Sequence, residues 1–231
     1  MKKLALLLAA WALAWAAEDY PAALARLETA LTSDPDSLRH ASEYRQLVIQ
    51  AKEYDRCLKF FEKLVAEHPQ SANAYLNYGF AYVDKIPVAG SITQVILANT
   101  ALTQFTRSVE IQPSWVAYYT RGNAYLYWPK IFNRTKLGVT DLEAAMKIQK
   151  EQPKRTYHVR TFIALGEGYW KLDELAKAKA VWNEGLKEFP DNSMLKVLRS
   201  KEGDELKTLI EDHLDPNKRV DTDLKEIWSE P

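Results

Sequence analysis

The stretch VRTFIALGEGYWKLDELAKAKAVWNEGLKEFP, residues 159–190, carries the spacing that decides the fold. Counted from Val159, positions 4, 7, 8 and 11 lie on one face of a first helix, and positions 20, 24 and 27 lie on one face of a second. Position 32 is a proline, which ends a helix. In that order the eight residues are Phe162, Leu165, Gly166, Tyr169, Ala178, Trp182, Gly185 and Pro190. Because the residues at positions 8 and 20 are small, the two helices can pack closely, and the stretch predicts a helical hairpin.

The same spacing recurs upstream in residues 38–71, 72–114 and 115–153. In the first of these segments Arg45 replaces the small residue of position 8, so this copy is degenerate. Cys57 takes position 20 there, and we interpret it as a small core residue and not as a reactive thiol. Repetition at this period predicts hairpins that stack, each covering the apolar face that its neighbour leaves open.

This set of positions resembles the tetratricopeptide repeat (TPR) family, whose signature residues 159–190 match at all eight positions. The resemblance implies an all-α fold, a right-handed solenoid of helical hairpins closed by capping helices. It divides a solenoid over 17–214 into a half repeat, four repeats and a capping pair, at 17–37, 38–71, 72–114, 115–153, 159–192 and 193–214. Residues 215–231 then form a C-terminal tail, which we expect to be extended, with Leu224, Ile227 and Trp228 docked on the body.

The N-terminal residues admit two interpretations. Lys2 and Lys3 precede an apolar run, and the small residues Ala14 and Ala16 favour cleavage before Ala17, so residues 1–16 are typical of an export signal. That interpretation predicts a periplasmic or otherwise exported protein. Alternatively, the same residues are the first helix of the half repeat and stay in the mature protein as a structural or anchoring helix.

The composition argues against several classes of function. The 31 basic and 31 acidic residues balance without a basic stripe, which argues against a nucleic-acid partner. A single cysteine cannot form an internal disulfide, and the four histidines lack the spacing of metal ligands. Motifs for a catalytic nucleophile or a phosphate-binding loop are absent from the sequence, so we expect no enzyme, no cofactor and no metal site. No stretch after the signal is long and apolar enough to span a membrane.

Function is then expected to lie in binding. The resemblance implies that the first helix of each hairpin lines a concave groove. The groove residues that we expect to contact a partner are Asn73, Asn77, Phe80, Tyr119, Asn123, Tyr127, Arg160, Glu167 and Trp170, and the wider lining includes Arg39, Ser42, Gln46 and Asp84. Rings cover apolar ligand surface and amides pair with backbone groups, which favours a protein or peptide partner. Only Asn77 fits the carboxylate clamp of chaperone-binding members, so a chaperone-tail receptor is not expected.

Two insertions between the helices of a hairpin distinguish this chain. About ten extra residues lie within 83–100 and about four within 127–136. The second insertion carries Trp128, Pro129, Phe132 and Arg134, and tryptophan and arginine are residue types that dominate interface energies. Because both insertions fall at the same junction of adjacent repeats, we expect them side by side, either contacting a partner or folded onto the stack.

Two functions fit these observations. The first is a non-enzymatic periplasmic scaffold that binds a protein or peptide partner through the groove and the inserted loops, with assembly of an envelope complex as one such role. The second is a periplasmic small-molecule-binding protein, similar to the helical-repeat proteins associated with TRAP transporters. A sealed, aromatic-lined cavity would favour the second function, and an open groove would favour the first.

Overall fold

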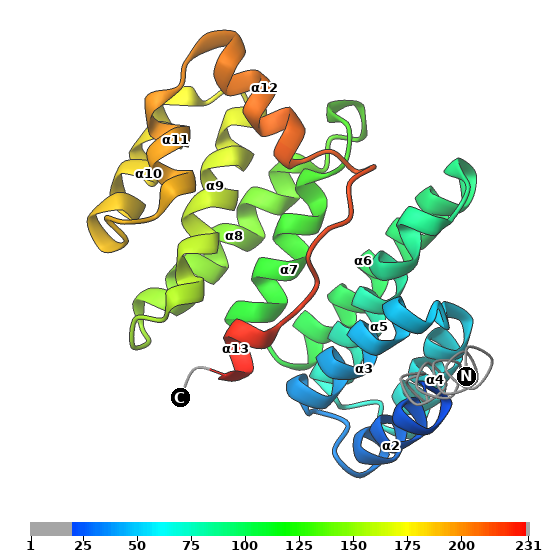
Figure 1. Cartoon of the computed structure of the whole chain (residues 1–231). Helices are drawn as coiled ribbons and strands as arrows, with labels where there is room; N and C mark the ends of the chain where they lie inside the picture. The colour runs from blue at the N-terminus through cyan, green and yellow to red at the C-terminus, as the bar shows by residue number, and fades with distance from the viewer. Residues whose placement is uncertain (1–19, 230–231) are drawn as a thin grey trace, which may run out of the picture.

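The computed structural model describes residues 20–229, and within that range it contains α-helices and short 3-10 helices without strands (Figure 1). The predicted export signal, residues 1–16, lies outside the described residues. The helices are α2 Tyr20–Ser33, α3 Leu38–Ala51, α4 Tyr54–Glu67, α5 Ala72–Lys85, η1 Ile86–Val88, α6 Ser91–Ile111, α7 Trp115–Leu126, η2 Lys130–Phe132, α8 Thr135–Lys150, η3 Thr156–His158, α9 Val159–Lys171, α10 Leu175–Glu188, α11 Ser193–Ser200, α12 Gly203–His213 and α13 Lys225–Ser229. They form a solenoid of antiparallel hairpins, so the predicted all-α TPR fold class is confirmed.

The first helix of a hairpin begins at a polar capping residue in most repeats. The side chains of Ser37, Ser71 and Ser114 each accept a hydrogen bond from the backbone N–H three residues on, and Asn192 does the same for α11. Such a cap satisfies one of the free N–H groups at a helix start and contributes about 1 kcal/mol. The caps therefore fix where α3, α5, α7 and α11 begin.

Close packing within a hairpin depends on residues without a side chain. A Cβ atom added at Gly166 of α9 would lie 2.0 Å from the indole nitrogen of Trp182 on α10. A Cβ atom added at Gly138 of α8 would lie 2.7 Å from the carbonyl oxygen of Gly122 on α7. These separations are shorter than any van der Waals contact, so the two helices of these hairpins pack at a distance that only small residues permit.

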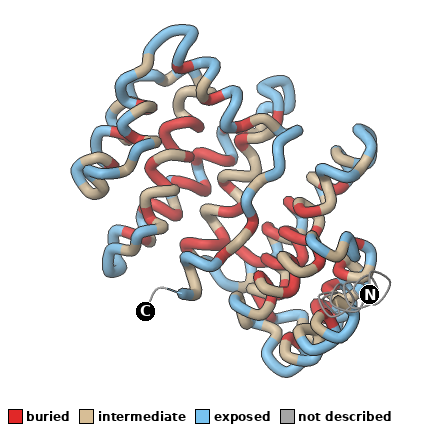
Figure 2. Tube along the Cα trace, viewed as in Figure 1, coloured by how far each residue is buried: buried red, intermediate tan, exposed pale blue. Residues whose placement is uncertain are grey.

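The apolar core runs along the stack between the helices (Figure 2). Phe61, Phe105, Leu142 and Trp182 are at most 1% exposed and lie one in the second helix of each successive hairpin. Cys57 is also buried, and burial raises the pKa of its thiol well above the ordinary value. A buried, protonated thiol is inert, which agrees with the interpretation of Cys57 as a core residue.

The turns inside the hairpins are of two kinds. The α3–α4 and α9–α10 turns are tight and contain one residue in the left-handed region, Lys52 with φ 59° and Asp173 with φ 62°. The other two hairpins contain η1 and η2, and α6 is the longest helix among residues 20–229, with 21 residues. The insertions thus leave the stack regular and project beyond it.

The C-terminal segment first caps the stack and then turns back along it. Leu195 and Leu198 of α11, with Leu206 and Ile210 of α12, are at most 1% exposed and cover the last hairpin. After α12 the chain runs as an extended segment along the solenoid and ends in α13, which contacts α3 and η3 (Figure 1). The last residues described are thereby brought next to the first full hairpin.

Candidate functional site: the concave groove and the C-terminal tail

The concave groove predicted from the sequence holds the chain's own C-terminal tail, residues 215–229. In Figure 1 this tail leaves α12, passes α7 and reaches α3, so it crosses the groove from the last hairpin to the first. Thr222 is 2% exposed and Leu224 is 7% exposed, whereas residues 216–219 are exposed. The tail is therefore seated in its second half and solvated in its first.

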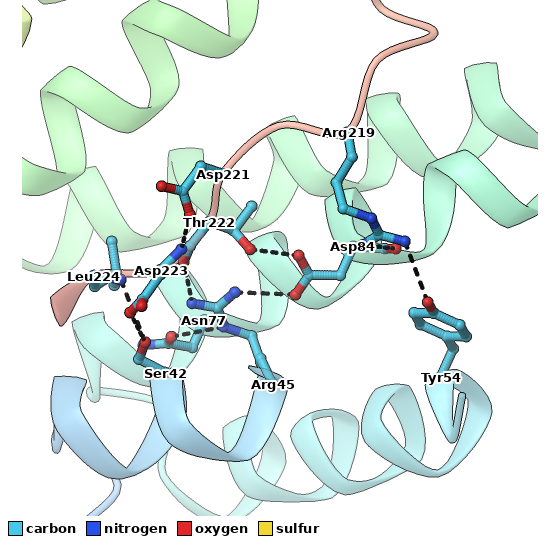
Figure 3. Close-up of polar contacts among 10 residues, drawn as sticks. All are labelled: Ser42, Arg45, Tyr54, Asn77, Asp84, Arg219, Asp221, Thr222, Asp223 and Leu224. Carbon is cyan, nitrogen blue, oxygen red and sulfur yellow. Dashed lines mark hydrogen bonds and ion pairs between the residues drawn. The ribbon is translucent and has the colours of Figure 1, made fainter. Parts of the chain in front are cut away.

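The centre of the contact is a buried ion pair between two helices of the groove, shown in Figure 3. Arg45 of α3 donates to Asp84 of α5 at 3.0 Å, and both side chains are at most 2% exposed. Arg45 also donates to Asn77 Oδ1 at 3.1 Å and to the backbone carbonyl of Thr222 at 2.7 Å. The hydroxyl of Thr222 donates to the second oxygen of Asp84 at 2.5 Å. One residue of the tail thus provides both an acceptor for the cation and a donor for the anion.

A second contact involves the backbone of Leu224, two residues after Thr222 in the tail. Ser42 of α3 donates to the carboxylate of Asp223 at 2.9 Å, and its oxygen accepts the N–H of Leu224 at 3.3 Å. The Leu224 side chain joins an apolar cluster that includes Phe80 and Trp115. The groove therefore binds main chain, an acidic side chain and an aliphatic side chain of one extended segment.

The two ends of the tail are held by arginines. Arg219 of the tail donates to the hydroxyl of Tyr54 at 3.3 Å (Figure 3). Arg160 of α9 donates to Glu226 of α13 at 3.0 Å. The guanidinium of Arg39 lies 5.5 Å from the ring centre of Trp228, a cation–π contact. Because these contacts reach α3, α4 and α9, the tail joins the first full hairpin to the last.

Beside the tail, the C-terminal half of the groove is a polar pocket of about 720 Å³. Tyr119, Asn123, Tyr127, Arg160 and Glu167 from the predicted groove set line it, together with tail residues such as Lys218 and Asp221. The Tyr119 ring stacks on Trp115 with its centre 4.9 Å away and the ring planes 2° apart. The pocket is open to solvent and is not the sealed cavity that a small-molecule carrier would have.

A buried carboxylate closes this pocket on one side. Glu167 is 0% exposed, and His213, at the end of α12, contacts its Oε1 through Nδ1 at 2.6 Å. Burial raises the pKa of the Glu167 carboxyl, and the hydrogen bond to Glu167 raises the pKa of the His213 imidazole. This pair links α9 to the last residue of α12, just before the tail.

On the other side of the tail lies an apolar pocket of about 300 Å³. Both insertions contribute to its wall: Pro87 and Val95 come from the first, and Trp128, Pro129 and Phe132 come from the second. Arg134 lies over the Trp128 ring, 3.7 Å from its centre, and donates to Asn99 of α6 at 2.8 Å. The two insertions thus meet around one pocket, and the tail forms the wall opposite to them.

Several apolar side chains of the two insertions are exposed in the described part of the chain, and two of them, Val95 and Phe132, line this pocket. Ile92 is 82% exposed, Ile131 is 88% exposed and Phe132 is 52% exposed, whereas Trp128 is buried. Most isolated exposed apolar residues need no explanation, but a set of them on and beside two insertions that share one pocket is typical of an interaction surface. We call this group, with Val88, Val95, Ile96 and Leu137, the loop patch.

The predicted site residues fall into three groups in the structure. The first group, Asn77, Phe80 and Arg160, lies under or against the tail. The second group lines the two pockets and consists of Tyr119, Asn123, Tyr127, Glu167, Trp128, Pro129 and Phe132, with Arg134 on Trp128. Asn73 and Trp170 do neither: the Asn73 amide donates to the carbonyl of Asp36 at 2.9 Å, and Trp170 packs against the C-terminal part of the core.

Arg45 and Thr222 are the residues of this site that the repeat spacing does not select. By spacing alone Arg45 is a degenerate small position, although a charged residue at a buried position requires a buried partner. Asp84, in the groove lining of the next repeat, is that partner. A cation at position 8 of a repeat is therefore a usable signal for a groove site, whereas no signal in the sequence points to Thr222.

Other kinds of site are not found in the part of the chain that is described. Residues 20–229 contain no group of three or more histidine, cysteine, aspartate or glutamate side chains placed to hold a metal ion. Over the same residues, no helix is both long enough and apolar enough to pass through a lipid bilayer.

Comparison with known proteins agrees with this fold. Residues 14–78 match the tetratricopeptide repeat family. A thermophilic TPR protein of Thermus thermophilus, TTC0263, is similar in structure with a TM-score of 0.57 at 20% identity, over 86% of this chain and 94% of that one. MamA has a TM-score of 0.53 at 16% identity, over 74% of this chain and 90% of that one. Among curated proteins, none matches. The fold is that of a TPR solenoid.

Proposed function

We propose that this protein is a non-enzymatic, exported TPR scaffold that binds an extended segment of a protein partner in its concave groove. One observation carries the proposal: the groove already holds an extended polypeptide, its own tail, through contacts to main-chain atoms. Arg45 donates to the carbonyl of Thr222, and Ser42 accepts the N–H of Leu224. Contacts of this kind give affinity for an extended chain, and side-chain pockets then give specificity.

The loop patch is the second contact surface in this proposal. It stays exposed while the tail lies in the groove, and two of its residues, Val95 and Phe132, line the apolar pocket that the tail borders. A partner that first docks on the patch would lie next to the groove, so the two surfaces would act on the same partner. Export to the periplasm follows in the proposal from the signal-like residues 1–16, and an envelope assembly is then the kind of complex that the scaffold would serve.

A small-molecule carrier of the TRAP-transporter-associated kind is the alternative, and the polar pocket of about 720 Å³ has a suitable size for it. We favour the scaffold because the same pocket is open and has a polypeptide as one wall.

Site-specific photo-cross-linking tests the proposed function. A photoreactive amino acid placed at position 119 in the groove or at 132 in the loop patch is expected to cross-link the same partner protein in the native envelope fraction. Position 175, an exposed leucine that lines neither pocket, is the matched control and should capture nothing specific. Mass spectrometry of the same sample identifies the N-terminus of the mature chain. Equal capture at all three positions would contradict the scaffold. A chain that still begins at Met1 would contradict export with cleavage, because residues 1–16 would then be a structural or anchoring helix.

A further inference from the structure

The tail contact is made of groups that tolerate separation in water. Beneath the tail lie Ser42, Arg45, Asn77 and Asp84, all polar or charged and all at most 3% exposed. When a buried ion pair becomes exposed, it regains hydration, whereas exposing apolar surface to water costs free energy. Apart from Leu224, the apolar residues that the tail contributes here, Ile227 and Trp228, are only half-buried.

The connection between α12 and the seated part of the tail would allow the tail to dissociate from the groove and bind again. Residues 215–219, DPNKR, connect it to α12, and all but Asp215, which is half-buried, are exposed. A tethered segment of this kind competes at an effective concentration in the millimolar range for short flexible linkers. An external segment with the same chemistry would therefore bind weakly while the tail is seated, and more tightly when the tail is weakened.

Displacement of the tail would change the shape of the groove. Lys218, Val220 and Asp221 of the tail border both the apolar and the polar pocket, as do Asn123 and Tyr127, so the tail forms part of the partition between them. Without the tail, the two pockets would lose that part of the wall between them.

We propose that residues 219–228 are an internal stand-in for the partner, and that the groove accepts an extended peptide with the same order of groups. Such a peptide carries a hydroxyl residue over Arg45 and Asp84, an acidic residue next to it, and a leucine one position further. Within the helical turn that follows, the peptide carries an acidic residue that pairs with Arg160 and an aromatic residue that contacts Arg39. This inference rests on the proposed function, because it names the chemistry of the partner segment at the same groove.

Binding of a fluorescently labelled peptide of residues 217–229, NKRVDTDLKEIWS, to the full-length protein tests the inference. In the Leu224→Asp variant the protein's own tail loses its apolar anchor, while every groove residue is kept. We expect the peptide to bind this variant at least about tenfold more tightly than wild type in fluorescence anisotropy, because the competing tail is weakened. Leu175→Asp, an equal change at an exposed leucine, should bind like wild type.

A second substitution locates the binding. Adding Arg45→Ala to Leu224→Asp should remove the gain, with circular dichroism showing that the helices of each variant remain folded. Equal peptide affinity in wild type and Leu224→Asp, or a gain that Arg45→Ala leaves intact, would overturn the inference. That result is separable from failure of the proposed function, since cross-linking at positions 119 and 132 can still find a partner when the tail peptide does not bind.

Discussion

The interior of the hairpins and the contact between tail and groove are two buried surfaces with opposite chemistry. Inside the hairpins, rings and aliphatic side chains such as Phe162 and Trp182 are fully buried and lie close in sequence. Under the tail, Ser42, Arg45 and Asp84 are buried just as fully, and their partners in the tail are 138 to 182 residues away in the chain. Opening the first surface exposes apolar area, and opening the second exposes charges that water solvates. The difference indicates that the hairpins supply stability and the tail supplies a contact that can be exchanged.

The largest expected effect is a difference in unfolding free energy between alanine variants of two tryptophans, one in the core and one on the tail. Trp182→Ala removes a ring that is 0% exposed and packs against Gly166, and should lower the free energy of unfolding by about 3–5 kcal/mol. Trp228→Ala removes a half-buried ring on the tail and a cation–π contact to Arg39, and should cost about 1 kcal/mol or less. Urea denaturation followed by circular dichroism measures both. Comparable losses for the two variants would mean that the tail is an integral part of the core.

Breaking the ion pair under the tail should have an intermediate effect. Arg45→Ala removes the donor to the Thr222 carbonyl and leaves Asp84 without its cation, which costs about 3–5 kcal/mol at a site that stays closed to water. Because the tail can leave and water can reach Asp84, we expect a smaller loss, about 1–3 kcal/mol, accompanied by faster hydrogen exchange in residues 222–224. A loss of about 3–5 kcal/mol without faster hydrogen exchange in residues 222–224 would show that the tail cannot leave the groove.

A single hydroxyl should account for a smaller part of the tail contact. Thr222→Val keeps the shape of the side chain and removes the donor to Asp84, so tail docking should weaken by about 1 kcal/mol. The matched control is Thr100→Val, because the Thr100 hydroxyl donates to the carbonyl of Ile96 on an exposed helix surface. Hydrogen exchange of the Leu224 amide should accelerate in the first variant only. Identical hydrogen exchange of the Leu224 amide in both variants would mean that the Thr222 hydroxyl does not contribute to tail docking.

The smallest expected effect is the pH dependence of the Glu167–His213 pair. The hydrogen bond raises the pKa of His213 in the folded protein above its ordinary value of 6.5, so the protonated ring stabilises the fold below about pH 6.5. That stabilisation is lost as the pH rises through the folded-state pKa. The melting temperature of wild type should therefore fall more between about pH 6 and about pH 8.5 than that of His213→Gln. Parallel curves for the two proteins would mean that the pair does not contribute to stability.

The fold class could be predicted from the sequence because its determinants are local. The spacing of Phe162, Gly166, Ala178 and Trp182 is set by the geometry of two packed helices, and each hairpin repeats it with its own neighbour. The extra length of the two insertions was visible in the same way, as a departure from a constant spacing. Their 3-10 helices and the shared pocket were not visible, because these depend on how adjacent turns pack in space.

The site could be predicted only in part, since it depends on contacts between distant segments. The sequence placed Asn77, Phe80 and Asp84 on the concave side, but it did not place a polypeptide over them. Arg45 joins α3 to the tail across 177 residues, a distance at which spacing along the chain carries no information. Arg45, which departs from the repeat pattern at a buried position, marks the centre of the site.

Hydrogen exchange of the full-length protein, resolved to single amides, tests the central claim most directly. The measurement compares the Leu224 N–H, which Ser42 holds in the groove, with the N–H of the buried residue Ala178, which donates to the Glu174 carbonyl in the first turn of α10. If the tail is an exchangeable ligand, Leu224 should exchange through an opening that costs several kcal/mol less than the global unfolding that releases Ala178. Equal protection at the two positions would contradict the claim, because the tail would then leave the groove only when the whole solenoid unfolds.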